Sequence, residues 1–226
     1  MKTTKLFWYV ILMSLIYSLS SCSNNGTYVA PSLHEISAEF TSYVIFDSAS
    51  SWVYQNDFNQ ILDTVTITKV LKDRRFHIEK PGVPGYYYNA IEMLMTSHET
   101  GMVKGEISAG SKYDANTVMT ENYRLYFNND RYFSIFIPKY PLGETQLLGI
   151  NEGNYTNIMV HDTLFVNELK YTEVYETSVK DYHDGNDTVF MKFYIAKYFG
   201  LVKWTKDSST LHDAWSLKSS SLLQTK

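Results

Sequence analysis

The chain has 226 residues, of which 44% are hydrophobic and 15% aromatic, and its 24 acidic and 20 basic side chains give a formal net charge of −4. The apolar fraction is too high for a disordered chain, and 5 Pro with 11 Gly are too few for a fibrous or low-complexity one. The acidic balance also argues against a nucleic-acid-binding protein.

The first 22 residues have the order typical of a secretory signal. Lys2 and Lys5 precede an apolar run from Leu6 to Tyr17, which only Ser14 interrupts, and small serines follow. This run is shorter than the roughly 20 residues that a membrane-spanning helix needs. The pattern therefore favours a cleaved signal over an N-terminal anchor helix or a buried helix.

The end of the signal is more specific. Leu19-Ser20-Ser21-Cys22 resembles the lipobox of bacterial lipoproteins, in which the signal is cut before the Cys and the Cys is acylated. The resemblance implies cleavage between Ser21 and Cys22 and lipidation of Cys22. Cys22 is also the only cysteine in the chain, so no internal disulfide can form. We expect the acylated Cys22 to hold the protein on a lipid bilayer, since each buried methylene contributes about 0.8 kcal/mol.

The expected organisation has three parts: a signal peptide (1–21), a lipidated Cys with a short polar tether (22–30) and a single β-rich domain (31–226). Removal of the signal takes away two lysines and no acid, so the mature chain is more acidic. That charge discourages attachment through the protein surface to anionic lipid. Surface-exported lipoproteins of the Bacteroidota often carry acidic residues directly after the Cys, and none occurs here. By this resemblance we expect an outer-membrane lipoprotein that faces the periplasm rather than the cell surface.

The main helix candidate comes next in the chain. Ser32 and Glu35 have the spacing of a capping box, and apolar residues recur at helical spacing from Leu33 to Tyr43. An irregular lead-in to the first strand is the alternative, because the residues up to Phe46 favour extended structure.

Alternation with period two dominates the rest of the chain. The predicted fold class is mainly antiparallel β, in a single-domain sandwich or a strongly curved, barrel-like sheet with little helix. Turn residues at 128–130 and 184–186 predict two hairpins. Thr188–Ala196 is apolar on both faces apart from Lys192, which predicts a central strand covered on both faces. The expected strands are 51–56, 61–72, 74–79, 86–97, 102–109, 122–128, 131–137, 158–166, 171–179, 188–198, 201–206 and 213–218.

Four segments carry a shared pattern. Val166–Val174 resembles V-N-G-x-x-Y-x-x-V, and Phe193–Trp204 resembles Y-Y-A-K-G-x-G-L-V-K. Ser51–Tyr54 and Ala214–Leu217 resemble an opening W-V-Y and a closing W-x-L strand. Together they resemble a group of mostly uncharacterised Bacteroidota lipoproteins with one β-domain after the lipobox.

Two glycines of that pattern are replaced here, by Glu168 and Tyr198, whereas Gly200 is kept. The group has no agreed activity, so the resemblance implies location and fold alone. We expect Gly200 to lie between two strands, where glycine allows positive φ or a close backbone approach.

Signatures of catalysis and metal binding are weak. The six His show no metal-site spacing, and three His-Asp neighbours (161–162, 183–184 and 212–213) would point to opposite faces of a strand. A hairpin turn explains Asp181–Asp187 better than a calcium loop, since the ladder of an EF-hand is missing. No nucleophile elbow, P-loop or dinucleotide fingerprint occurs. We expect no enzyme, no cofactor and no metal; a pair of carboxylates remains as a hydrolase alternative.

Aromatic residues provide one candidate contact surface. Tyr86, Tyr87 and Tyr88 follow a turn-rich segment and are candidates for ligand or partner contact. Ordinary strand packing is the alternative.

Four three-residue segments resemble the acceptor sequence of periplasmic O-glycosylation in Bacteroidota. Each begins with Asp, continues with Ser or Thr, and ends with a small or apolar residue. The resemblance makes acceptor sites of Ser48, Thr64, Thr163 and Thr188. The alternative is that Asp-Thr simply opens a strand.

These patterns predict a membrane-anchored envelope lipoprotein that acts as a non-enzymatic binding or accessory module, with an envelope protein as partner and no nucleic acid. The alternative is a carrier that holds a glycan or an apolar molecule on a concave sheet lined by Met93, Met95, Phe190, Met191 and Tyr194; a hydrolase ranks third. A large open apolar pocket would favour the carrier, and a filled core with a flat aromatic patch would favour the module. A cleft that holds two carboxylates would favour the hydrolase.

Overall fold

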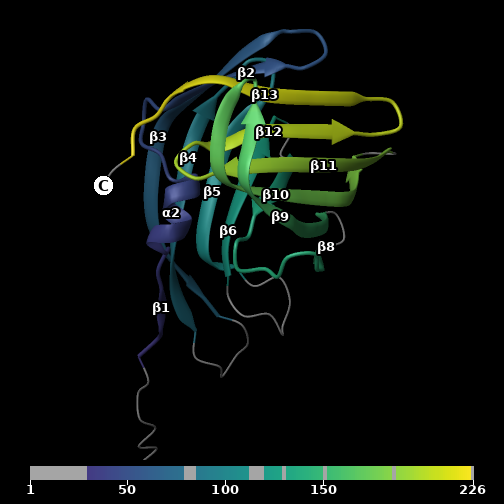
Figure 1. Cartoon of the computed structure of the whole chain (residues 1–226). Coiled ribbons are helices and arrows are strands. Elements are labelled where there is room, and N and C mark those ends of the chain that lie inside the picture. The colour runs from purple at the N-terminus through teal and green to yellow at the C-terminus, as the bar shows by residue number, and fades with distance from the viewer. Residues whose placement is uncertain are drawn as a thin grey trace, which may run out of the picture. The chain divides into compact units, whose positions relative to one another are not determined.

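The computed structural model describes residues 30–78, 85–111, 120–128, 131–149, 152–184 and 187–224 (Figure 1). Ser21 and Cys22, with the predicted lipobox, lie outside the described residues. Ser32–Lys226 forms one compact unit. The described part of the chain contains no helix with the length and apolar character needed to cross a bilayer.

The described residues form one mainly antiparallel sheet of 13 strands and one short helix, which confirms the predicted fold class. The order across the sheet is β7-β6-β5-β4-β3-β2-β13-β12-β11-β10-β9-β8, and β1 pairs with β4 in parallel. The elements are β1 (Leu33–His34), α2 (Ala38–Val44), β2 (Ser51–Asn56), β3 (Leu62–His77), β4 (Tyr86–Thr96), β5 (Met102–Ser111), β6 (Thr120–Phe127), β7 (Arg131–Phe136), β8 (Thr145–Gly149), β9 (Gly153–Val166), β10 (Leu169–Asp184), β11 (Asp187–Ala196), β12 (Gly200–Asp207) and β13 (His212–Ser221).

This sheet is open and folds over on itself. The strands β3 and β4 stand on one side of Figure 1 and β9–β11 on the other. The end strand β7 packs against β10, although the two are far apart in the sheet order. The Phe133 ring lies 4.4 Å from that of Tyr182, and the Thr177 hydroxyl donates to the Ile135 carbonyl at 2.7 Å. The core therefore lies between two halves of one sheet.

The helix begins later than the sequence predicted. Its N-cap is Ser37, whose hydroxyl accepts from the Phe40 backbone N–H at 3.2 Å. The predicted capping box at Ser32 does not form, because the Ser32 carbonyl accepts from the backbone N–H of Tyr87 and draws this segment into the sheet. Phe40 and Tyr43 are buried in α2 as the helical spacing predicted, and both rings contact Phe136 of β7.

Most predicted strands are confirmed within a few residues, but three expectations were wrong. The segments 61–72 and 74–79 form one strand, β3, because the exposed Asp73 continues the pairing with β4. The strand β8 and the start of β9 were missed. Only one face of β11 is fully buried, since Phe190, Lys192 and Tyr194 are half-buried on the other face.

Both predicted hairpins form. β6 pairs with β7 up to Phe127 and Arg131, and β10 pairs with β11 up to Asp184 and Asp187. The tips of these turns lie outside the described residues.

Two other turns have a left-handed backbone at non-glycine residues. Glu168 has φ 67° and Tyr198 has φ 65°, at the positions where the pattern has Gly. Gly200 has φ 76°, as its position between two strands predicted. The neighbouring strands therefore impose a left-handed backbone on two ordinary side chains at a cost in strain.

Candidate functional site

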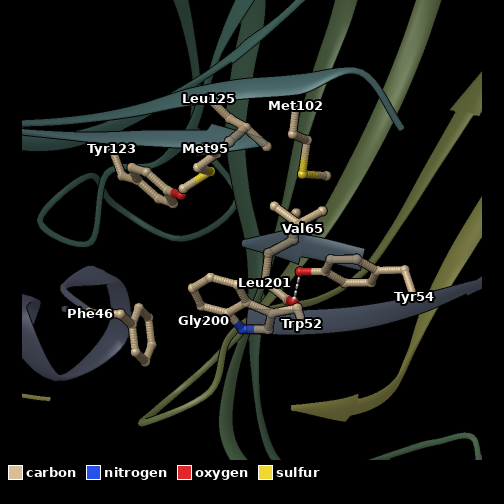
Figure 2. A pocket seen from close by; sticks show the side chains of 10 residues that line it. All are labelled: Phe46, Trp52, Tyr54, Val65, Met95, Met102, Tyr123, Leu125, Gly200 and Leu201. Atoms are coloured by element: carbon tan, nitrogen blue, oxygen red, sulfur yellow. Dashed lines mark hydrogen bonds between the residues drawn. The ribbon is translucent and has the colours of Figure 1, made fainter. Parts of the chain in front are cut away.

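Two of the family-like segments, 51–54 and 193–204, line one small cavity in the core, which we call the closed cavity because every residue that lines it is buried (Figure 2). The Trp52 indole N–H donates to the Phe199 carbonyl at 2.7 Å, and the Tyr54 hydroxyl donates to the Leu201 carbonyl at 2.7 Å. Trp52 thus binds the turn that precedes β12, and Tyr54 binds the start of β12 itself. A Cβ at Gly200 would lie 3.0 Å from the Phe46 ring, so this glycine allows the ring to close over the turn. These motif residues build the fold rather than a site.

This closed cavity has a volume of about 20 Å³, enough for one water molecule and far below the roughly 300 Å³ of small-ligand pockets. It is lined by Phe46, Trp52, Tyr54, Val65, Met95, Met102, Tyr123, Leu125, Gly200 and Leu201. The residues predicted to line a carrier do not share one surface. Met93, Met95 and Met191 are buried in the core, whereas Phe190 and Tyr194 lie on the other face of β11.

A larger hollow opens between the ends of β6 and β7 and the ends of β11–β13. We call it the Trp cleft, and it has a volume of about 300 Å³. It is lined by Glu99, Thr100, Gly101, Phe127, Asn128, Arg131, Phe133, Met191, Trp204, Lys206, Leu211, Asp213 and Trp215.

The floor of the Trp cleft is aromatic. The rings of Trp204 and Trp215 stack with centroids 5.9 Å apart and an interplanar angle of 10°. The Trp215 indole N–H donates to Asp213 at 2.9 Å, and the Asn56 amide donates to the other oxygen of the same carboxylate at 2.5 Å. Asp213 is therefore held in place at the edge of the floor.

One wall of the Trp cleft is the β4–β5 loop, and a buried carboxylate fixes it. Asp63 accepts from the backbone N–H of His98 at 3.0 Å, and from the backbone N–H and hydroxyl of Thr100 at 2.8 and 2.6 Å. Burial by itself raises the pKa of Asp63, but these hydrogen bonds outweigh it and hold the pKa below its ordinary value. The wall is therefore preorganised at neutral pH.

The rim of the Trp cleft carries balanced charge. Glu99 and Asp213 supply two carboxylates, and Arg131 and Lys206 supply two cations. A concave surface that combines an aromatic floor with a few polar groups is the usual form of a small-molecule site. The two Trp rings are only 3% and 6% exposed, so they close the bottom of the cleft and leave mainly the polar groups of the rim for contact with a small polar molecule.

The sequence did not reveal this cleft. Trp204 and Trp215 were interpreted as strand residues, and Asp213 as half of a His-Asp pair. His212 binds Asp207 at 2.9 Å, across the β12–β13 turn. The signal present in the sequence was two Trp residues flanking one turn, which alternation places on the same face.

The three consecutive tyrosines do not form one surface. Tyr86 is 5% exposed and its hydroxyl donates to the Gly110 carbonyl at 3.2 Å, whereas Tyr87 is 39% exposed. Tyr88 is half-buried and lies on the same side as Tyr86, with ring centroids 6.2 Å apart. Alternation along β4 therefore leaves Tyr87 alone as an exposed contact residue, beside Phe76.

All four residues of the glycosylation-like triplets are exposed: Ser48, Thr64, Thr163 and Thr188. The Asp that precedes Thr64 is Asp63, which already has a structural role in the loop described above.

A second polar cluster joins β9, β10 and β11. Glu176 accepts from Lys192 at 3.0 Å and lies 2.9 Å from a ring nitrogen of His161. Burial alone raises the pKa of Glu176, but these two hydrogen bonds outweigh it and lower the pKa. The partner of His161 is thus Glu176 rather than its neighbour Asp162. Within the described ranges, no group of three or more His, Cys, Asp or Glu is arranged to hold a metal ion.

Comparison with known proteins found no matching family model, no matching curated protein and no matching solved structure.

Proposed function

We propose that this chain is a lipid-anchored, non-enzymatic binding module of the bacterial cell envelope, tethered to the outer membrane through Cys22 and facing the periplasm. The Trp cleft is its recognition surface. The observation that carries this proposal is the cleft itself: about 300 Å³, with a stacked Trp floor, a charged rim and a wall fixed by Asp63.

The filled core supports a module over a carrier that encloses its ligand. The closed cavity of about 20 Å³ has no room for a glycan or a lipid chain. The larger hollows, of about 300 and 700 Å³, lie at the surface, and at least a third of their lining side chains are charged or strongly polar, which does not suit an apolar cargo.

One observation favours a hydrolase as the second candidate. Glu99 and Asp213 both line the Trp cleft, as a carboxylate pair requires. Asp213 already accepts two side-chain hydrogen bonds, from Asn56 and Trp215, which suits a structural role. We therefore rank binding first.

Anchoring is tested by Cys22→Ser in the native host. The proposal expects the parent protein in the outer-membrane fraction and the variant either unprocessed or released. A variant that is processed, acylated and membrane-bound like the parent would refute the anchor.

Recognition is tested by crosslinking the acylated protein in its envelope, followed by pull-down and native mass spectrometry. Lys206→Glu reverses one charge on the rim of the Trp cleft, and Lys170→Glu is the matched control on an exposed part of β10. We expect the bound partner or ligand to be retained by the parent and Lys170→Glu and lost from Lys206→Glu.

Equal retention by the parent and both variants would show that the Trp cleft is not the recognition surface. Turnover of a co-purified molecule that Asp213→Asn abolishes would replace the module with an enzyme.

A further inference from the structure

An exposed apolar row lies where the chain enters the domain. Leu33 of β1 pairs with Tyr87 of β4, and Tyr87 pairs with Phe76 of β3, so the three side chains stand side by side across three strands. Leu33, Phe76 and Tyr87 are 38%, 47% and 39% exposed, and Ile78 beyond them is 60% exposed. Residues paired across adjacent strands point to the same face. They therefore form one continuous apolar surface.

The two aromatic rings of this row are held in place. The centroids of Phe76 and Tyr87 are 4.8 Å apart. The Phe76 ring also lies directly against Gly85, where a Cβ would overlap it. The surface is thus a fixed feature rather than a set of free side chains.

Basic residues continue the same face of β3. Lys72 and Arg74 alternate along β3 with the same spacing as Phe76, and both are exposed beside an open hollow of about 700 Å³. Asp73 also lines this hollow, so its charged lining is two cations and one carboxylate. Within the described part of the chain neither Lys72 nor Arg74 forms an ion pair. The opposite face differs, because Arg75 there pairs with Glu92 at 2.6 Å. We call the six residues Leu33, Lys72, Arg74, Phe76, Ile78 and Tyr87 the tether-side patch.

The tether leads to this end of the domain. The backbone N–H of Tyr87 donates to the Ser32 carbonyl at 2.8 Å, which pins the chain beside the patch. Cys22 precedes Ser32 by ten residues in the sequence. Ten extended residues reach at most about 35 Å. An acyl group on Cys22 therefore limits how far Ser32 can lie from the bilayer.

We propose that the tether-side patch rests on the bilayer surface and orients the domain on it, with Phe76 and Tyr87 at the lipid headgroups and Lys72 and Arg74 beside anionic lipid. This inference rests on the proposed acylation of Cys22. Aromatic side chains favour the membrane–water interface, and clustered basic residues add attraction to anionic headgroups. The proposal differs from the expectation that the acyl group alone attaches the protein, because it gives this local surface a part in membrane contact although the chain is acidic overall.

The test is fluorescence quenching of the purified acylated protein on vesicles of phosphatidylethanolamine, phosphatidylglycerol and brominated phosphatidylcholine. Phe76→Trp places a probe in the patch, and Phe165→Trp is the matched control, because Phe165 is a 66% exposed aromatic residue in β9. Trp52, Trp204 and Trp215 are at most 6% exposed, so we expect brominated lipid to quench their fluorescence little. We expect the probe at position 76 to be quenched at least about twofold more than that at position 165.

Charge reversal supplies a second measurement. The double variant with Lys72→Glu and Arg74→Glu should reduce quenching of the probe at position 76. This reduction should be smaller at high salt, because salt screens the attraction to anionic lipid. Lys170→Glu should leave quenching unchanged.

Flotation of the same samples separates this inference from the anchor. If the protein floats with the vesicles but both probes are quenched equally or not at all, the patch does not face lipid and the inference is wrong. If the protein does not float, the anchor is wrong and the inference falls with it. If brominated vesicles do not quench the probe at position 76, but native envelope membranes shield it from aqueous iodide, the patch binds a protein partner and the inference is wrong.

Discussion

The closed cavity and the Trp cleft are two hollows of one folded sheet, and they differ in size and lining. At the closed cavity Trp52 donates a hydrogen bond to the β11–β12 turn and Tyr54 donates one to Leu201 of β12, and Phe46 packs over Gly200. About 20 Å³ of space remains there, against about 300 Å³ in the Trp cleft. Both hollows are lined by aromatic and Met side chains. The two linings differ in charge, because Glu99, Arg131, Lys206 and Asp213 line the Trp cleft, whereas no charged side chain lines the closed cavity.

This contrast predicts which substitutions should affect stability and which should affect binding. Changes in the closed cavity should lower the free energy of unfolding, because its neighbours are fixed by hydrogen bonds and collapse poorly. Changes to the exposed side chains of the cleft, such as Leu211, should affect stability less, whereas the buried Asp63 behind its wall should still contribute to it.

The largest effect is expected for Leu125→Ala. Leu125 is 1% exposed and lines the closed cavity, so truncation enlarges a hollow that cannot collapse. We expect the free energy of unfolding, measured by urea titration, to fall by about 2–5 kcal/mol. Leu147→Ala is the control, since Leu147 is 63% exposed. Equal effects of the two substitutions would show that the cavity residues are not a rigid core.

Asp63→Asn tests the wall of the Trp cleft. The carboxylate accepts three hydrogen bonds from the β4–β5 loop, and an amide cannot reproduce them all. We expect a loss of about 1–3 kcal/mol in the free energy of unfolding at neutral pH.

The same carboxylate predicts a pH dependence. Its pKa is lowered in the folded protein, so its contribution is present above the unfolded pKa of about 3.9 and is lost as the pH falls through the folded pKa. The parent protein should therefore lose stability in this acidic range more steeply than Asp63→Asn. Asp162→Asn, at an exposed position, is the control. Parallel pH profiles for the parent and Asp63→Asn would contradict the assigned role.

The two turns that lack their family-like glycines give a smaller effect of opposite sign. Glu168 and Tyr198 have φ of 67° and 65°, which glycine adopts without strain. Glu168→Gly and Tyr198→Gly should each raise the free energy of unfolding by about 0.5–1 kcal/mol. Gly200→Ala should lower it, because its φ is 76° and a Cβ would crowd Phe46. A loss of stability in both glycine variants would mean that the native side chains make contacts that offset the strain.

The sequence predicted the local features well because alternation reports which face of a strand is buried. β2 was predicted with its bounds, and its alternation places Trp52 and Tyr54 in the core. The left-handed position of Gly200 followed from a glycine between two strand patterns. The helix began at Ser37 rather than Ser32 because pairing with β4, a long-range contact, competes with local capping.

The candidate site could not be predicted, because it depends on which strands become neighbours. Asp63 meets Thr100 across 37 residues of sequence, and Asn56 meets Asp213 across 157. Alternation within one strand carries no information about such pairings. The row of Leu33, Phe76 and Tyr87 is hidden for the same reason, since each residue lies on a different strand.

The smallest effect on stability is expected for Leu211→Ala. Leu211 lines the Trp cleft and is 45% exposed, whereas Leu125 lines the closed cavity, so the same truncation is made in both hollows. The free energy of unfolding should change by less than about 0.5 kcal/mol, because little apolar area leaves water on folding at this position. Retention of the bound partner or ligand should fall nevertheless, since Leu211 contributes apolar surface beside the Trp floor. A stability loss close to that of Leu125→Ala would mean that Leu211 and the Trp cleft belong to the core. The cleft would then no longer support a recognition surface.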